Sequence, residues 1–124
     1  MHDAMHSVCE TGPYLREARA CGLKDDELLR IVELMARNPK YGVEIVGSSG
    51  FRKFRVAGRG KGKSGGYRVI TFFSGKLVPV FLITIFSKGE KSNLSDREVN
   101  GLKRLGKEIV ATYARRVVPL RSGR

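Results

Sequence analysis

The sequence is poor in the residues that build disulfide frameworks and metal sites. It has two cysteines, two histidines and no tryptophan among 124 residues. Two cysteines cannot form the disulfide framework of a small secreted domain, so Cys9 and Cys21 are expected to be reduced, partly buried thiols. His2, His6 and Cys9 match no standard zinc-ligand spacing, and the end of a chain is a poor cage for an ion. The sequence therefore predicts no metal site.

A long hydrophobic run is also absent. The longest apolar stretch covers residues 77–86 and contains Pro79, whereas a membrane-spanning helix needs about 20 apolar residues. Residues 1–6 are polar and lack the hydrophobic region of a signal peptide. We therefore expect a cytoplasmic protein that does not bind membranes.

Acidic residues are scarce in the part of the chain where basic residues are concentrated. The whole chain has 24 Lys+Arg and 12 Asp+Glu, a net charge of +12. Residues 1–50 carry a net −2, residues 51–91 carry ten basic groups and one acidic group, and residues 92–124 carry a net +5. Charge that served only solubility would be spread out. The central block therefore predicts a surface for a polyanion, either a phosphate-binding face or a docking face for an acidic protein.

The apolar content is sufficient for one folded domain. Apolar residues make up 41% of the chain, which is enough to bury a core at this length. We expect a single domain over residues 1–113, followed by a basic tail over residues 114–124.

The first third of the chain has the pattern of two helices. Residues 8–11 form a possible short strand, and Pro13 suits the first turn of a helix that ends before Gly22. Asp25 or Asp26 is expected to cap a second helix, which ends at residues 38–39. Its apolar residues recur at helical spacing: Leu28, Ile31, Val32 and Met35. This pattern predicts an αα-hairpin.

The rest of the domain has the pattern of three strands and a helix. Residues 51–57, 67–73 and 78–86 are predicted to form an antiparallel meander, with a turn at residues 74–76. Ser95 and Glu98 form a capping box that begins a final helix. Its expected apolar face holds Val99, Leu102, Leu105, Ile109, Val110 and Tyr113. The predicted fold class is α+β, in which an N-terminal αα-hairpin packs on a small, mostly antiparallel sheet with a C-terminal helix, in the order β-α-α-β-β-β-α.

A glycine- and lysine-rich loop over residues 58–66 separates two of the predicted strands. Its sequence fits relaxed P-loop and dinucleotide-binding patterns, but both motifs need a helix directly after the loop. Here a strand follows, so we expect neither a nucleotide nor any other cofactor. Lys61 and Lys63 can instead reach a backbone phosphate, which glycines allow the main chain to approach. The alternative is a solvated hairpin loop whose lysines discourage edge pairing.

Basic residues from neighbouring segments support the phosphate-binding interpretation. Lys53 and Arg55 lie near the end of one strand, Arg68 lies at the start of the next, and Lys88 and Lys91 follow the third. These groups converge at one end of the predicted sheet, where their repulsion is costly unless a polyanion binds. Tyr67 would either stack on a base or be a half-buried strand tyrosine.

The residue types at this end favour a particular kind of RNA chemistry. The cluster has no histidine or aspartate, and Glu90 is its single carboxylate, so metal-dependent nuclease chemistry is disfavoured. Cleavage by attack of the 2′-OH on its own phosphate needs a base, an acid and stabilisation of the phosphorane charge. Crowded lysines are able to act as bases, and arginines hold phosphoryl oxygens.

Three separated motifs resemble those of a known family. Residues 50–55, 58–70 and 86–95 look like the corresponding segments of RelE/ParE-superfamily toxins, in the expected order, and most closely like the HigB-type, RelE-like branch. The resemblance covers residues 8–112. It implies a RelE-like α+β fold, ribosome-dependent cleavage of mRNA in the A site, and a cognate antitoxin, often of helix-turn-helix type.

The resemblance also implies roles for individual residues. Arg68 matches the arginine expected to hold the scissile phosphate, and Phe86 stands where a tyrosine is often found, so a hydroxyl role is lost there. The catalytic residues implied are Lys61, Lys63, Arg68 and Lys88. The RNA-binding residues implied are Lys53, Arg55, Arg59, Tyr67 and Lys91.

Two other functions remain open at this point. The ParE branch of the superfamily poisons gyrase, and in such a protein the basic loop need not be catalytic. A non-catalytic module that binds RNA or ribosomes would also use these cations, with salt-sensitive binding but without cleavage.

Overall fold

A computed structural model describes residues 5–57, 66–75, 78–87 and 94–116, with the last helix's side chains described as far as Tyr113. The elements follow one another as β1 (Val8–Glu10), α1 (Gly12–Ala20), α2 (Asp25–Arg37), β2 (Val43–Glu44), β3 (Phe51–Val56), β4 (Tyr67–Phe72), β5 (Val80–Ser87) and α3 (Asp96–Arg116). The α+β class is confirmed. The helix α3 runs three residues beyond the expected end of the domain at residue 113.

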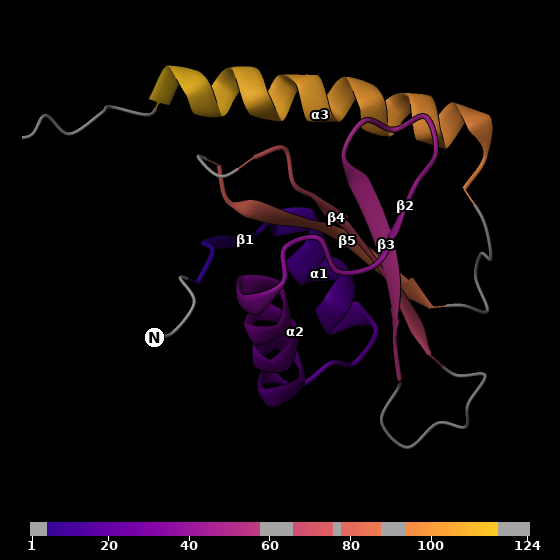
Figure 1. Cartoon of the computed structure of the whole chain (residues 1–124). Coiled ribbons are helices and arrows are strands. Elements are labelled where there is room, and N and C mark those ends of the chain that lie inside the picture. The colour runs from indigo at the N-terminus through magenta and orange to yellow at the C-terminus, as the bar shows by residue number, and fades with distance from the viewer. Residues whose placement is uncertain (1–4, 58–65, 76–77, 88–93, 117–124) are drawn as a thin grey trace, which may run out of the picture.

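The five strands form one sheet in the order β1-β5-β4-β3-β2 (Figure 1). β1 is parallel to β5, and the other neighbours are antiparallel. The predicted meander of β3, β4 and β5 is confirmed as the centre of this sheet. The strand β2 is an addition to the predicted order, because its two exposed residues carry no alternating pattern.

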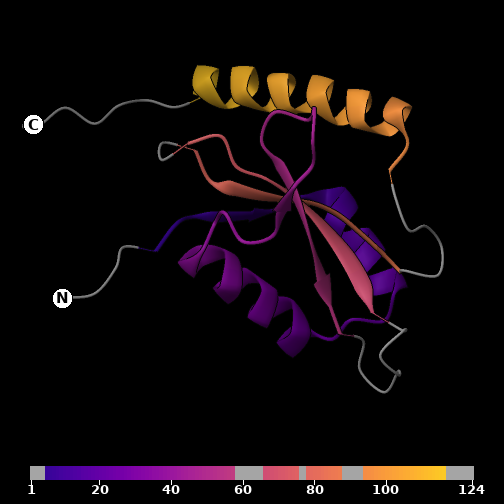
Figure 2. The ribbon, with the colours of Figure 1, turned by 45° about the vertical axis from the view of Figure 1, so that its right-hand side comes forward.

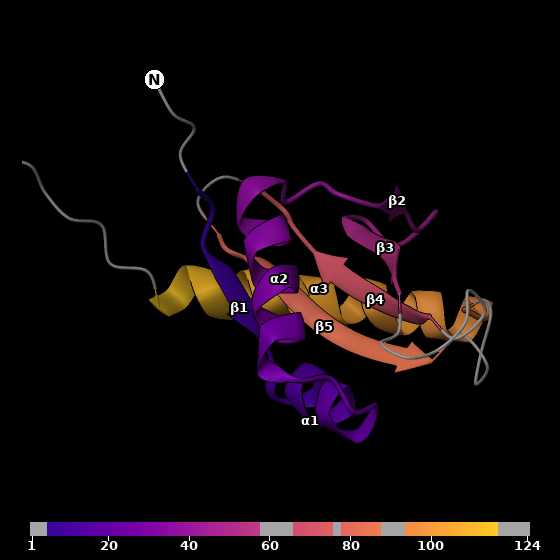
Figure 3. The ribbon, with the colours of Figure 1, turned by 90° about the horizontal axis from the view of Figure 1, so that it is seen from below.

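Helices cover both faces of the sheet. Figures 2 and 3 show α1 and α2 on one face and α3 on the other. Alternation along β4 divides the core between the two faces, since Tyr67 and Val69 pack on the α1–α2 side while Ile70 and Phe72 pack on the α3 side. A β-bulge in the β4–β5 pairing lies between Ile70 and Thr71.

The starts of α1 and α2 show how these helices are fixed. The Thr11 side chain caps α1 by accepting a hydrogen bond from the Tyr14 N–H (3.3 Å), and its hydroxyl donates to the Leu82 carbonyl of β5 (2.8 Å). The prediction that Asp25 or Asp26 caps α2 is wrong. Both residues lie in the first turn of α2, where their charge suits the helix dipole.

The predicted capping box of α3 is confirmed. The Ser95 N–H donates to the Glu98 carboxylate (2.9 Å), and the Glu98 N–H donates to the Ser95 hydroxyl (3.1 Å). Val99, Leu102, Leu105, Ile109 and Tyr113 pack on the sheet. Val110 was expected on the same face, but it is an exposed residue.

Gly106 allows α3 to approach the aromatic side chains on the sheet. A Cβ atom at Gly106 would lie 2.9 Å from a ring carbon of Phe72 and 3.0 Å from one of Phe51. Gly101, one and a half turns earlier, has nothing within 4 Å of the corresponding position. Close packing on the sheet therefore explains why a glycine is needed at position 106, and it does not explain the glycine at position 101.

We predict opposite effects for alanine at the two glycines. Gly101→Ala should stabilise the fold by about 0.5–1 kcal/mol through helix propensity. Gly106→Ala should destabilise it by about 1–3 kcal/mol, because the added methyl group forces the rings of Phe51 and Phe72 to move. Thermal unfolding of both variants measures this difference, and equal shifts in the same direction would contradict the packing described for Gly106.

Candidate nucleic-acid interface

Three basic residues of the predicted site, two expected to bind RNA and one expected to be catalytic, lie on the same face of the sheet. Arg55 of β3 is directly opposite Arg68 of β4, which is opposite Phe86 of β5. Lys53 is opposite Ile70, a core residue of the α3 side. Residues directly opposite one another, and those two positions apart, share a face. Lys53, Arg55 and Arg68 therefore form one group on the α3 side, which we call the cation face.

Arg68 lies at the centre of the cation face and is partly buried. Its Nε atom is buried and has no hydrogen-bond partner among the described residues. A buried donor without an acceptor costs about 1–3 kcal/mol, and the guanidinium group presents its donors in a fork that matches a phosphate. The side chain of Arg68 is thus held in an environment that an anion would complete.

The carboxylates found in ion pairs lie elsewhere. In the described part of the chain, ion pairs join Arg19 to Asp25 and Arg30 to Asp26, each at 3.8 Å. All four residues belong to α1 and α2 or to the turn between them, on the other side of the sheet. Lys53, Arg55 and Arg68 take part in no ion pair among these residues. Like charges directly opposite each other repel, so Arg55 and Arg68 raise the free energy of the unliganded face.

The remaining predicted site residues fall outside the described ranges. These are Arg59, Lys61, Lys63, Lys88 and Lys91. The described residues that flank them lie at the same end of the sheet as Arg55 and Arg68, since β3 ends at Val56, β4 begins at Tyr67 and β5 ends at Ser87. Gly66 packs close against β3 there, because a Cβ atom on it would lie 2.9 Å from the Val56 carbonyl oxygen.

The prediction that Tyr67 binds RNA needs correction. Its side chain belongs to the core on the α1–α2 side and is 6% exposed. Its hydroxyl donates a hydrogen bond to the Cys21 carbonyl at the end of α1 (3.0 Å). Strand alternation turns Tyr67 to the face opposite Arg68. The ring is therefore unavailable for stacking on a base at the cation face, and the half-buried alternative fits better.

The structure adds two carboxylates near this end of the sheet. Glu17 of α1 and Glu98 of α3 line a pocket of about 490 Å³ together with Phe86, the cross-strand neighbour of Arg68. Glu90 is therefore no longer the single acidic residue to consider. The capping box signalled the position of Glu98 on its helix. No local pattern signalled Glu17, which reaches the pocket through tertiary packing.

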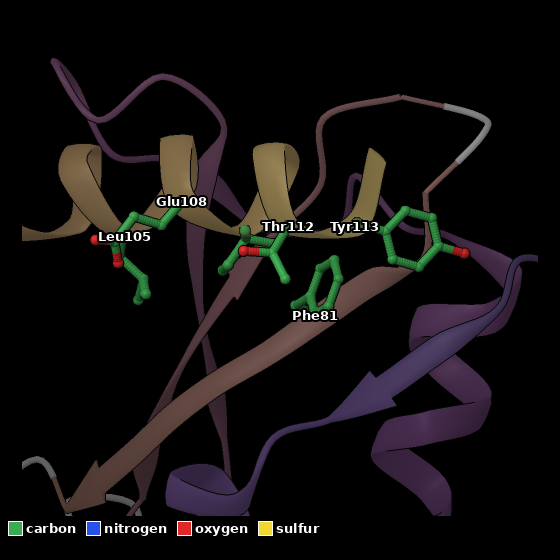
Figure 4. A pocket seen from close by; sticks show the side chains of 6 residues that line it. Phe81, Leu105, Glu108, Thr112 and Tyr113 are labelled. Atoms are coloured by element: carbon green, nitrogen blue, oxygen red, sulfur yellow. The ribbon is translucent and has the colours of Figure 1, made fainter. Parts of the chain in front are cut away.

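A second pocket lies under the far half of α3 and lacks the features of a site for RNA. It has a volume of about 370 Å³ and lies between α3 and the start of β5 (Figure 4). Its lining is Phe81, Leu105, Glu108, Ile109, Thr112 and Tyr113. Only one of these residues is charged, and it is acidic. The described residues also contain no group of three or more metal-ligating side chains and no helix able to cross a membrane.

Comparisons with known proteins agree with the fold and the motifs. The chain matches the family model described as "RelE toxin of RelE / RelB toxin-antitoxin system" over residues 7–122. It is also similar to the structure of a mutant E. coli toxin RelE in the free state, with a TM-score of 0.53 and 18% sequence identity. The similarity covers 82% of this chain and 96% of that chain. At this identity the structural likeness shows the shared fold.

The position of Tyr67 leads to a prediction about stability. Tyr67→Phe should lower the free energy of unfolding by about 1 kcal/mol, because the Cys21 carbonyl loses its donor. RNA binding should stay unchanged, because the hydroxyl is on the other face from Arg68. Denaturant unfolding and an RNA-binding titration measure the two effects. Weaker RNA binding with unchanged stability would contradict the assignment of Tyr67 to the core.

Proposed function

The chain belongs to the RelE toxin family, and on that basis we propose that it is a ribosome-dependent endoribonuclease that cleaves mRNA in the A site. One observation carries the proposal beyond family membership: Arg68 has a buried Nε without a partner, beside a second arginine, on a face that the described carboxylates leave unpaired. Such an arrangement binds a phosphate, and the phosphates of RNA fit it.

The proposed reaction is attack of a ribose 2′-OH on the adjacent phosphate. The 2′-oxygen forms a new bond to phosphorus, the bond to the 5′-oxygen breaks, and a 2′,3′-cyclic phosphate remains. A base takes the proton of the 2′-OH, and an acid protonates the departing 5′-oxygen. The phosphorane between these steps carries extra negative charge, which fixed cations stabilise.

We assign the phosphate-binding role to Arg68 and a supporting role to Arg55 and Lys53. The guanidinium group of Arg68 presents a positive charge in a planar fork of donors, so it serves as an electrostatic clamp. Arg55 is exposed and lies directly across from Arg68, a position from which it can hold a neighbouring phosphate. Lys53, two residues before Arg55 on the same face of β3, extends this contact.

Lys61, Lys63 and Lys88 are the proposed base, acid and additional phosphate ligands. The proposal for these three residues rests on their place in the sequence between and after the strands of the cation face. Arg59 and Lys91 are proposed to contact the RNA backbone. An antitoxin that covers the cation face is the proposed partner, because an acidic segment would satisfy the same unpaired charges. The HigB-type branch and the helix-turn-helix class of antitoxin stay predictions.

We predict that Arg68→Ala lowers the rate of mRNA cleavage on translating ribosomes by about 100-fold, since loss of one donor to a developing oxyanion costs about that much. Arg68→Lys should recover part of the rate, because it restores the charge but not the fork. The matched control is Arg52→Ala. Arg52 precedes Lys53 on β3 and pairs with Thr71 on the opposite face, so its loss should leave the rate unchanged.

The same assay separates the other functions. Equal cleavage by the parent, Arg68→Ala and the double variant Lys61→Ala/Lys63→Ala would show that the site is assigned wrongly. DNA damage with intact mRNA in cells producing the protein would indicate gyrase poisoning. Salt-sensitive RNA binding without breaks and without growth arrest would indicate a non-catalytic module.

A further inference from the structure

The two helical layers of the protein differ in their balance of charge. The segment that holds α1 and α2, residues 12–37, has five basic and five acidic residues. Some of these charges pair directly, as Arg19 does with Asp25 and Arg30 with Asp26. Surface ion pairs contribute little stability, but they leave little net field on this side of the molecule.

The outer side of α3 is different. Lys103, Arg104 and Lys107 are all exposed, and among the described residues none of them forms an ion pair. Residues three and four apart are neighbours on a helix, so the three cations form a stripe about 6 Å long on the side of α3 that faces away from the sheet. Arg97, also exposed, lies nearer the start of the same helix. We call Lys103, Arg104 and Lys107 the α3 stripe.

The acidic residues of α3 do not match the α3 stripe. Glu98 is bound to the backbone of Ser95 and lines the pocket beside β5. Glu108, four residues after Arg104, lines the pocket between α3 and β5 (Figure 4) and forms no ion pair with Arg104 among the described residues. Asp96 lies in the first turn of α3, seven residues before Lys103 and outside the three- and four-residue spacing of helix neighbours. The stripe is therefore a row of cations without ion pairs among the described residues, on a helix whose inner side packs on the same sheet face that carries the cation face (Figure 3). Nothing in the cleavage chemistry uses these three residues.

We propose that the α3 stripe binds the phosphate backbone of ribosomal RNA and sets the affinity for the ribosome separately from cleavage. This inference rests on the proposed function, since it takes the ribosome as the partner. The charge pattern favours RNA over an acidic protein. Protein interfaces depend on buried apolar or aromatic anchors, and beside the α3 stripe the described part of the helix exposes a single large apolar residue, Val110. Phosphate contacts need only accessible cations.

The course of α3 places the α3 stripe near the proposed cleavage site. The start of α3 lies beside the end of β5, where Leu94 and Glu98 share a pocket with Phe86. From there α3 runs across the sheet toward the start of β5, where Tyr113 packs on Phe81. An RNA segment bound along α3 would thus approach the cation face from one side. In this arrangement the α3 stripe would hold the protein on the ribosome, and the cation face would act on the mRNA.

The test is equilibrium binding of the full chain to purified ribosomes that carry no mRNA, at several salt concentrations. We expect the triple variant K103Q/R104Q/K107Q to bind about 10-fold more weakly than the parent. Its plot of log affinity against log salt should be shallower by about 2–3, because each phosphate contact contributes roughly 0.7–0.9 to the slope. On ribosomes with mRNA, KM should rise with kcat unchanged.

The matched control removes three exposed cations from the charge-balanced layer. The variant R16Q/K24Q/R37Q has the same net charge as the triple variant and should bind ribosomes as the parent does. Thermal unfolding of both variants checks that each one folds. If K103Q/R104Q/K107Q binds ribosomes with the affinity and salt slope of the parent, the inference is overturned. This holds also if the same variant binds an acidic antitoxin more weakly, because the stripe would then be a protein-binding surface. Equal losses in both variants would also overturn it.

Because these ribosomes carry no mRNA, the result does not depend on cleavage. Stripe-dependent binding by a parent that cuts no mRNA would support the α3 stripe while refuting the proposed nuclease. If the parent cuts mRNA but the triple variant binds ribosomes as tightly as the parent does, the proposed nuclease is supported and the role of the α3 stripe is refuted. A parent that does not bind ribosomes at low salt would overturn the inference itself.

Discussion

Repulsion between Arg55 and Arg68, which lie directly opposite each other across β3 and β4, is the constraint on which the account of this protein depends. The strands hold the two arginines together because the neighbouring cross-strand pair is apolar and buried on the other face of the sheet. Phe54 lies opposite Val69, and both belong to the core under α1 and α2. Apolar burial thus keeps like charges close at a site where solvent alone would separate them. A bound phosphate relieves the repulsion, so the fold stores part of the binding free energy as electrostatic pre-organisation.

The balance of acidic and basic residues differs between the two helical layers of the fold. The layer of α1 and α2 balances its acids and bases, and its ion pairs are local. The sheet face toward α3 and the outer side of α3 carry cations without described acidic partners. A molecule with one neutral side and one positive side is oriented by the field of a polyanion before contact. In the proposed function, the net charge therefore matters less for solubility than for the direction from which this protein would approach RNA.

The sequence predicted the parts of this structure that depend on local patterns. Alternation and helical spacing located the meander and the capping box of Ser95 and Glu98, and strand ends placed Lys53, Arg55 and Arg68 together. Other features depend on tertiary packing. Alternation along β4 places Tyr67 on the face opposite Arg68, but no local pattern predicts that its hydroxyl bonds to the Cys21 carbonyl, 46 positions away, and so makes it part of the core. The approach of Glu17 to the β5 pocket likewise has no local signal.

The central claim is that this family member cuts RNA with the RNA's own 2′-OH. Its most direct test uses translating ribosomes and an mRNA with a single 2′-deoxynucleotide on the 5′ side of the cut phosphate. The account predicts that the unmodified mRNA is cut to leave a 2′,3′-cyclic phosphate and that the 2′-deoxy mRNA is not cut at that position. Cleavage of both mRNAs at the same phosphate would contradict the account, because a nucleophile other than the 2′-OH would then be at work.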